Sequence, residues 1–188
     1  MQADLSRNRA EILEFLKENH IPFEFYEHPA AMTIEDCLAL PFATKDVTFC
    51  KNIFLCNRQK TNYYLMVLRP GTPYRTSVVS KALGVSRLSF APNEALPELL
   101  HLTSGSVSPL ALLYDREHQI VFGYEKAIRA TEKIAFHPCD NSATLVFRQD
   151  DFWGKVLPAL GVVGIEIDLD GESGQLALPN PRNSCIFV

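Results

Sequence analysis

The sequence predicts an α+β domain in which a mixed, largely antiparallel and curled sheet is surrounded by helices. Three observations lead to this fold class. Strand-like segments outnumber helix-like ones, several of them are joined by short polar links, and strands and helices do not alternate strictly along the chain. With 188 residues, of which 47% are hydrophobic and 21% charged, the chain is typical of one globular domain with a buried core.

The N-terminal part contains two predicted helices and one predicted strand. Residues 6–19 carry apolar side chains at helical spacing, and residues 23–28 alternate between apolar and polar as a short strand does. Residues 33–40 begin with Thr33 and carry Asp36 three positions later. This pattern is similar to a capping box and predicts a second helix.

The central part predicts a hairpin followed by two short helices. Residues 50–57 and 62–70 have the composition of two strands joined by a polar turn. Residues 77–84 predict a helix that ends at a glycine. Residues 91–102 predict another helix, with Asn93 as its N-terminal cap.

Two further strand pairs are predicted in the C-terminal half of the chain, residues 110–115 with 120–125 and residues 133–138 with 143–147. Residues 150–160 predict a late helix that holds the only tryptophan. A last strand is expected within residues 162–170. We predict one domain over residues 1–165 and a C-terminal extension of unknown role over residues 166–188.

Composition limits the compartment and the chemistry. No apolar stretch approaches the roughly 18 residues that a membrane-spanning helix needs. The N-terminus is a charged amphipathic pattern unlike a secretory signal. The five cysteines are scattered without a C-x-x-C pair, so we expect reduced, buried side chains and no zinc site. These features predict a cytoplasmic protein without a metal or a membrane partner.

Charge is distributed unevenly along the chain. The net charge is −4, but residues 45–87 contain eight lysines and arginines against the single acidic residue Asp46, a local net charge of +7. A polarised chain of this kind can receive a phosphate backbone at one face although the whole protein is acidic. The same charges are equally consistent with an ordinary solvated surface.

The segment HLTSGSVSPLALLYD, residues 101–115, places small and turn-forming residues directly before an apolar run. Such a loop is either a plain turn or a cradle that offers backbone N–H groups to a ligand. No nucleophile-elbow pattern surrounds Ser106 or Ser108, and glycine-rich phosphate motifs and zinc-binding histidine motifs are absent. A cysteine hydrolase built on Cys50 or Cys139 stays open, without specific support.

Lys51 lies in a predicted strand whose alternation puts it on the same face as Ile53 and Leu55. A lysine on such an apolar face either extends to the rim of the sheet or serves a site. His28 and His137 each precede a proline at a strand end, where a structural role and a role in a site both stay open.

Four stretches together make the chain resemble the YbaK/prolyl-tRNA-synthetase editing-domain family, and most closely its free-standing prolyl-tRNA deacylases. They are YEHPAAMT (26–33), CKNIFL (50–55), SGSVSPLAL (104–112) and FHPCDNSAT (136–144). The third stretch contains the family's G-x-x-x-P loop, and the fourth its His-Pro element followed by Asn and a small-Thr pair. The resemblance covers roughly residues 6–160 and implies that residues 1–165 form an aminoacyl-tRNA editing domain.

The resemblance implies trans-editing, the hydrolysis of the ester that joins a wrong amino acid to tRNA(Pro), with alanine as the expected amino acid. It implies that water attacks with help from the 2′-hydroxyl of the substrate, and that neither a metal, another cofactor nor an acyl-enzyme takes part. Aminoacylated tRNA(Pro) is the expected partner and prolyl-tRNA synthetase a candidate one. The alternatives are a Cys-tRNA(Pro) deacylase, a non-catalytic module that binds tRNA or another oligonucleotide, and a small-molecule esterase.

The resemblance also implies the site residues. Catalytic roles fall to Lys51 as the anchor of the terminal phosphate, to Gly105, and to His137 as pocket wall or orienting group. Backbone N–H groups of Gly105 and Ser106 are the expected oxyanion donors. The expected substrate-binding residues are His28, Met32, Thr33, Asn52, Ser106, Val107, Ser108, Pro109 and Asn141. Of these, Met32 and Thr33 are expected to wall the amino-acid pocket together with Ile34 and the glycine loop. The expected tRNA-binding residues are Lys45, Arg58, Lys60, Arg69, Arg75 and Lys81.

Overall fold

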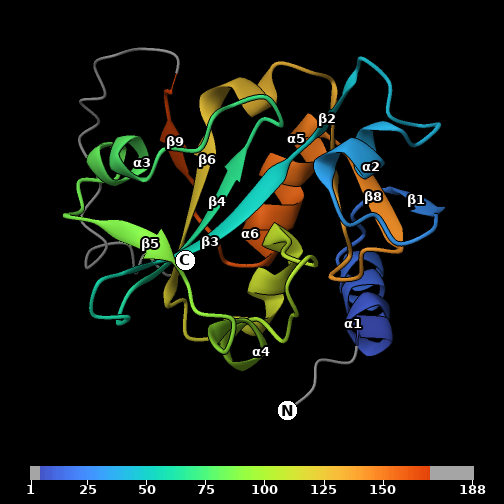
Figure 1. Ribbon diagram of the computed structural model, residues 1–188. Coiled ribbons are helices and arrows are strands. Elements are labelled where there is room, and N and C mark those ends of the chain that lie inside the picture. The colour runs from blue at the N-terminus through green and yellow to red at the C-terminus, as the bar shows by residue number, and fades with distance from the viewer. Residues whose placement is uncertain (1–4, 170–188) are drawn as a thin grey trace.

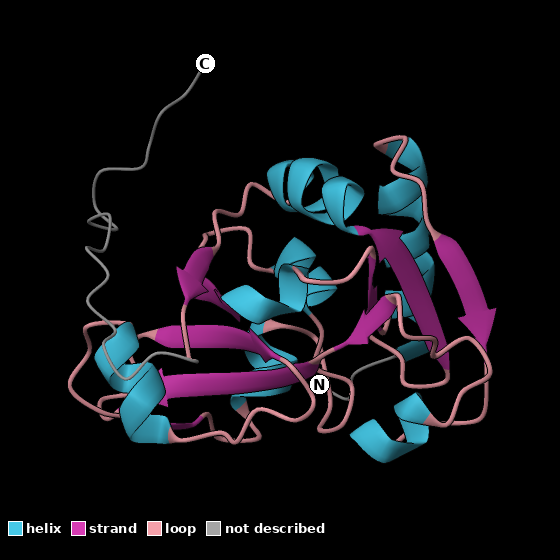
Figure 2. Ribbon diagram, turned by 90° about the horizontal axis from the view of Figure 1, so that it is seen from above, coloured by secondary structure: helices cyan, strands magenta, loops and turns pink. Residues whose placement is uncertain are grey.

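The computed structural model describes residues 5–169 and confirms the mixed α+β class, with the strands divided between two sheets (Figures 1 and 2). The larger sheet has the order β5 (Leu88–Phe90), β3 (Lys51–Asn57), β4 (Tyr63–Leu68), β6 (Ile120–Glu125) and β9 (Ile165–Ile167). The smaller sheet has the order β1 (Glu24–Glu27), β8 (Ala143–Arg148), β7 (Lys133–Phe136) and β2 (Val47–Phe49).

At one point the chain passes from the smaller sheet to the larger one through a single residue. Strand β2 ends at Phe49 and β3 begins at Lys51, so that only Cys50 separates a strand of one sheet from a strand of the other. Strand β2 pairs in parallel with β7, whereas β3 pairs antiparallel with both β4 and β5. In Figure 1 the two strands follow one another along the same cyan ribbon. The sequence predicts one curled sheet, and the structure instead has two sheets that the chain joins at this crossing.

Several predicted elements are confirmed with small changes in their ends. The N-terminal helix is α1 (Leu5–Glu18), and the second helix is α2 (Ile34–Leu38). The capping box of α2 is present, since the Asp36 N–H donates to Thr33 Oγ1 at 3.1 Å and the Thr33 N–H donates to Asp36 Oδ2 at 2.9 Å. Strands β3 and β4 form the predicted hairpin, and β7 and β8 form the predicted pair.

The remaining helices surround the sheets. They are α3 (Thr76–Ala82), α4 (Ala95–Leu99), two 3₁₀ helices, η1 (Pro109–Tyr114) and η2 (Lys126–Arg129), and one late helix. The late helix is continuous but changes its winding, with α5 (Gln149–Asp151), a π-helical turn η3 (Phe152–Val156) and α6 (Leu157–Ala159). No described helix is long and apolar enough to cross a membrane.

Two local predictions are wrong. Residues 110–115 were expected as a strand, but residues 110–114 lie in η1, because Pro109 cannot donate to a sheet ladder and the Leu110 N–H donates to Ser108 Oγ at 3.3 Å. The expected hairpin partner, β6, pairs in parallel with β4 instead. Asn93 does not cap α4 with its side chain, since that helix begins at Ala95 after Glu94.

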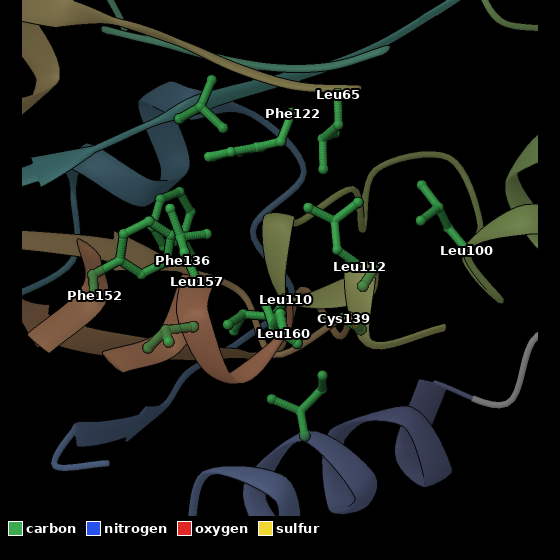
Figure 3. Packing of buried hydrophobic residues seen from close by; sticks show 14 of the residues in the cluster. Leu65, Leu100, Leu110, Leu112, Phe122, Phe136, Cys139, Phe152, Leu157 and Leu160 are labelled. Carbon is green, nitrogen blue, oxygen red and sulfur yellow. The ribbon is translucent and has the colours of Figure 1, made fainter. Parts of the chain in front are cut away.

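The main core fills the space between the two sheets. Phe54, Leu65 and Phe122 of the larger sheet meet Phe136 and Phe147 of the smaller one. Figure 3 shows residues of η1 and of the late helix among them, including Leu110, Leu112, Phe152 and Leu157. The opposite face of the larger sheet, with Ile53, Leu55 and Met66, is covered by α3. Lys51 and Asn52, adjacent in β3, therefore belong to opposite faces of the sheet.

Strand β9 crosses the predicted domain boundary at residue 165 and pairs in parallel with β6 through Ile167. Residues 170–188 of the predicted extension, with Cys185, lie outside the described residues. The four described cysteines are free thiols. Cys37, Cys56 and Cys139 are buried as expected, whereas Cys50 is only partly buried.

Candidate functional site

A cavity of about 210 Å³ lies at the crossing between the two sheets. Four segments far apart in the sequence form its walls: the segment that leads into α2, the start of β3, the glycine-containing loop before η1, and the residue after β7. The lining residues are Ala31, Met32, Thr33, Ile34, Cys37, Cys50, Lys51, Asn52, Gly105, Val107 and His137. All three predicted catalytic residues line this one pocket.

Lys51 is half-buried at the edge of the pocket. Its Nζ atom donates to the carbonyl oxygen of Thr72 at 3.0 Å. The alternation of β3 places Lys51 on the face of Ile53 and Leu55, as the sequence predicts, at the first position of the strand. An ammonium group carries three donors, and one carbonyl acceptor leaves two of them for a ligand.

Asn52 points to the other side of the strand and contacts the glycine-containing loop. Its Nδ2 atom donates to the carbonyl oxygen of Val107 at 2.8 Å, which fixes the orientation of the amide. Its Oδ1 atom is buried and has no hydrogen-bond partner within the described part of the chain. Because buried polar atoms are nearly always paired, this acceptor is suited to a donor on a bound ligand.

The glycine-containing loop offers backbone rather than side-chain groups to the pocket. Gly105 has a φ of +90°, a conformation that L residues rarely adopt. The Ser106 N–H donates to the Thr103 carbonyl oxygen at 3.2 Å, so the expectation that it is an oxyanion donor is not met. Among the described residues, the backbone N–H groups of Gly105 and Val107 donate no hydrogen bond. Both groups are therefore available to donate to a ligand.

The loop serines do not line the pocket, contrary to expectation. Ser106 and Ser108 are 1% and 0% exposed. Ser106 Oγ donates to the Thr103 carbonyl oxygen at 2.8 Å, and Ser108 Oγ accepts from the first turn of η1. Pro109 is buried as the first residue of η1 and likewise does not reach the pocket. These three residues hold the loop in shape, because small polar side chains readily bond the backbone near turns and helix starts.

His137 is a wall of the pocket with a defined orientation. Its Nδ1 atom lies 2.8 Å from the Ala143 carbonyl oxygen, which can only accept, so Nδ1 carries the proton. Its Nε2 atom lies 3.6 Å from the Sγ atom of Cys37. Burial lowers the pKa of His137 below its ordinary value. The ring is therefore neutral near pH 7, with the lone pair of Nε2 on the side of Cys37.

His28 lies behind His137, outside the wall of the pocket. The two ring centres are 6.0 Å apart, and His28 bonds Pro29 through Nδ1 and Thr144 through Nε2, at 2.8 and 2.9 Å. Asn141 is at the rim, where its Nδ2 atom lies 2.9 Å from the Sδ atom of Met32. The Met32 side chain is 65% exposed, and its Cε atom approaches the position that a Cβ atom on Gly105 would take, at 3.6 Å.

The predicted tRNA-binding residues fall into separate groups. Arg69 and Arg75 line a groove of about 660 Å³ that also includes Thr72, the partner of Lys51. Arg75 and Lys81 line a further hollow beside α3. Arg58 and Lys60 are exposed in the turn after β3, at the opposite end of that strand from Lys51. Lys45 is exposed before β2.

Ala31 and Cys37 are the two pocket residues to which sequence reasoning assigned no role, and of these Cys37 carries a functional group. It is the buried residue of the short helix α2, and nothing in the local pattern distinguishes it from an ordinary core cysteine. Burial raises the pKa values of both Cys37 and Cys50, so neither thiol is ionised near pH 7. Within the described residues, no group of three or more His, Cys, Asp and Glu side chains could hold a metal ion.

Comparison with known proteins agrees with this arrangement. The family model of the aminoacyl-tRNA editing domain matches residues 28–153. The prolyl-tRNA editing protein ProX of Acetoanaerobium sticklandii is 30% identical over 158 residues, which cover 84% of this chain and 94% of that protein. The prolyl-tRNA synthetase associated domain-containing protein 1 of Mus musculus is 32% identical over 151 residues, 78% of this chain and 88% of that protein.

A solved structure supports the fold. The crystal structure of a candidate trans-editing enzyme for prolyl tRNA synthetase superposes with a TM-score of 0.65 at 14% identity, over 88% of this chain and 99% of that one. The fold and the matched residues thus define an aminoacyl-tRNA editing domain. The chain belongs to the aminoacyl-tRNA editing family, and the predicted enzyme class, an aminoacyl-tRNA deacylase, is confirmed at the level of that family.

Proposed function

We propose that this protein is a trans-editing deacylase that hydrolyses the ester of Ala-tRNA(Pro) by water attack. One observation carries the proposal: residues from all four family stretches, represented by Met32, Lys51, Gly105 and His137, line a single small cavity. The name of the Acetoanaerobium sticklandii relative, a prolyl-tRNA editing protein, supports tRNA(Pro) as the carrier. Aminoacylated tRNA(Pro) is therefore the partner that we propose, and association with prolyl-tRNA synthetase remains a prediction.

Binding of the tRNA 3′ end begins at Lys51. Its ammonium group is oriented by the Thr72 carbonyl oxygen and keeps two donors for the phosphate of the terminal nucleotide. The groove with Arg69 and Arg75 adjoins this contact, and its lining contains no acidic residue. Arg69 forms an ion pair with the buried Glu125 at 2.6 Å, so Arg75 supplies the positive charge available to a phosphate. The acceptor strand would follow this groove, since single-stranded nucleic acids bind to positively charged channels.

The ester is activated by position rather than by a nucleophilic side chain. The N–H groups of Gly105 and Val107 would bind the oxyanion that forms when water attacks, and one such donor is worth about 10²–10³ in rate. The unpaired Oδ1 atom of Asn52 would accept from the substrate, either from the α-ammonium group or from a ribose hydroxyl. The protonated, neutral thiols of Cys37 and Cys50 favour water as the attacking group.

The size and polarity of the pocket favour a small apolar amino acid. Ala31, Ile34 and Val107 form apolar walls around a volume of about 210 Å³ that the ribose must partly share. A proline site in a synthetase cannot strongly reject a smaller side chain, which creates the need for such an editing step. Cysteine has a similarly small side chain, so a Cys-tRNA(Pro) deacylase is the second candidate that this pocket favours.

The test is single-turnover deacylation of Ala-, Cys-, Ser- and Pro-tRNA(Pro), with the Lys51→Ala variant and Lys17→Ala as a control on α1. We expect rapid loss of the Ala ester and retention of the Pro ester. We expect a 10- to 100-fold loss of rate in Lys51→Ala, roughly the size of one hydrogen bond to a charged group. Preferential hydrolysis of the Cys ester would favour the second candidate. Protection of all four esters by a protein that binds tRNA would support the non-catalytic module instead.

A further inference from the structure

Glu125, at the end of β6, is a carboxylate enclosed in the protein interior. It is 0% exposed and accepts three kinds of hydrogen bond from one short segment. The backbone N–H and the Nε atom of Arg69 donate at 2.8 and 2.6 Å. The Thr72 hydroxyl lies 2.9 and 2.8 Å from its two oxygens. A buried charge needs such a set of donors, because burial without partners is costly.

The segment that Glu125 holds is a tight turn. The Thr72 N–H donates to the Arg69 carbonyl oxygen at 3.2 Å, and Pro70 and Gly71 occupy the two central positions. This turn follows β4 directly, opposite the start of β3, where Lys51 pairs with Leu68. The carboxylate thus fixes both ends of a four-residue turn that stands beside the pocket.

The turn of residues 69–72 also contacts Lys51. The carbonyl oxygen of Thr72 accepts from Lys51 Nζ at 3.0 Å, while the hydroxyl of the same residue donates to Glu125. Burial raises the pKa of Cys50, the residue before Lys51, and the negative charge of Glu125 raises it further.

We propose that Glu125 is a positioning residue for deacylation, which holds the turn of residues 69–72 so that Thr72 keeps the ammonium group of Lys51 at the pocket. This inference rests on the proposed function of Lys51 as the phosphate anchor. Glu125 itself does not line the pocket. Its effect on the reaction passes entirely through Lys51.

A double-mutant cycle tests this route. We compare single-turnover deacylation of Ala-tRNA(Pro) by the full-length protein and by Glu125→Gln, Lys51→Ala and the double variant. We expect Glu125→Gln to lower the rate about tenfold, since a small misplacement of a binding group has effects of this order. In the Lys51→Ala background the same change should have almost no further effect. Additive losses would overturn the proposal, because independent sites add.

The matched control is Asp115→Asn. Asp115 is another buried carboxylate that holds a turn, by accepting from the N–H groups of Gln119 and Ile120 at 2.9 and 2.8 Å. We expect this variant to lose stability, as Glu125→Gln does, but to keep the rate of the folded enzyme. If Asp115→Asn slows deacylation equally at equal folded fraction, Glu125 has only a structural role and the proposal is wrong.

A milder pair of variants covers the case in which Glu125→Gln does not fold. Thr72→Val removes the hydroxyl that donates to Glu125 but keeps the carboxylate and the shape, whereas Thr72→Ser retains a hydroxyl. We expect a several-fold loss of rate in Thr72→Val and recovery in Thr72→Ser. Equal rates in the two variants would contradict the proposed coupling.

The last readout does not depend on activity. We measure the rate at which an amine-reactive acylating reagent labels Lys51, by mass spectrometry, in the wild type and the variants. Loss of the hydrogen bond between the Lys51 ammonium group and the Thr72 carbonyl oxygen should raise the labelling rate several-fold in Thr72→Val and Glu125→Gln. The labelling rate should not change in Asp115→Asn. If labelling changes while the wild type hydrolyses no ester, the proposed function fails and the positioning stands. If the wild type is active and Glu125→Gln changes neither rate, the positioning fails alone.

Discussion

The Sγ atom of Cys37 lies 3.6 Å from Nε2 of His137, and both side chains line the same pocket. The imidazole is held from its other side by the Ala143 carbonyl oxygen, so the thiol is the donor and Nε2 the acceptor. This pairing resembles a thiol–imidazole nucleophile in composition but not in charge. Burial raises the pKa of Cys37 and lowers the pKa of His137, and both effects favour the neutral pair.

Thiol reagents should therefore leave the activity intact. A neutral thiol reacts slowly, because the thiolate is the nucleophilic form. We expect iodoacetamide at about neutral pH to label Cys37 and Cys50 only slowly and to cause no loss of deacylation within the time that labels the unfolded chain. Serine-directed reagents should likewise have no effect, since Ser106 and Ser108 are buried. Stoichiometric labelling with parallel loss of activity would support an acyl-enzyme mechanism.

Stability should depend on pH through His137. The folded protein lowers the pKa of this side chain below 6.5, so the unfolded chain binds the proton more readily. The contribution of neutral His137 to the free energy of unfolding is fully present above about pH 6.5. It is lost as the pH falls from there toward the pKa of His137 in the folded protein. We expect wild type to lose more free energy of unfolding between about pH 7.5 and 5.5 than His137→Gln does. Urea denaturation at both pH values measures this difference, and equal losses would show that other groups dominate.

Gly105→Ala should impair both stability and activity. At a φ of +90° an alanine is strained, at a cost of about 1–3 kcal/mol, and its Cβ atom points toward Met32 at the mouth of the pocket. Gly154→Ala is the matched control, since a Cβ atom there meets nothing within 4 Å and alanine favours a helix. Thermal unfolding and single-turnover kinetics should show a double loss for Gly105→Ala only. Full activity of that variant would make the loop an ordinary turn.

The basic residues should contribute unequally to tRNA binding. Arg75 and Lys81 lie on the side of the Lys51–Thr72 contact, whereas Arg58 and Lys60 lie in the turn at the far end of β3. We expect Arg75→Ala with Lys81→Ala to weaken binding of tRNA(Pro) and to reduce the slope of log Kd against log salt by about 2. The Arg58→Ala, Lys60→Ala pair should have the smaller effect. A larger effect of the Arg58→Ala, Lys60→Ala pair would contradict this prediction and would indicate that the tRNA binds at the turn between β3 and β4.

Much of the local structure could be predicted from the sequence, because it depends on neighbours along the chain. The capping box at Thr33, the hairpin of β3 and β4, and the shared face of Lys51, Ile53 and Leu55 follow from spacing and alternation alone. The prediction of a strand over residues 110–115 was wrong, because a short apolar run looks the same in the sequence whether it forms a strand or a buried 3₁₀ helix.

The sequence by itself determined the class of fold, the family and the residues around Lys51, Gly105 and His137, since these rest on local patterns and on a set of motifs in fixed order. Only the tertiary structure decided which groups meet. In the tertiary structure the strands on either side of Cys50 belong to two different sheets, and the loop serines do not line the pocket, whereas Cys37 does. Lys51 bonds Thr72, which in turn bonds Glu125. The physical reason is that these contacts join residues far apart in the sequence, and their geometry is fixed by packing of the whole core rather than by the preference of any one segment.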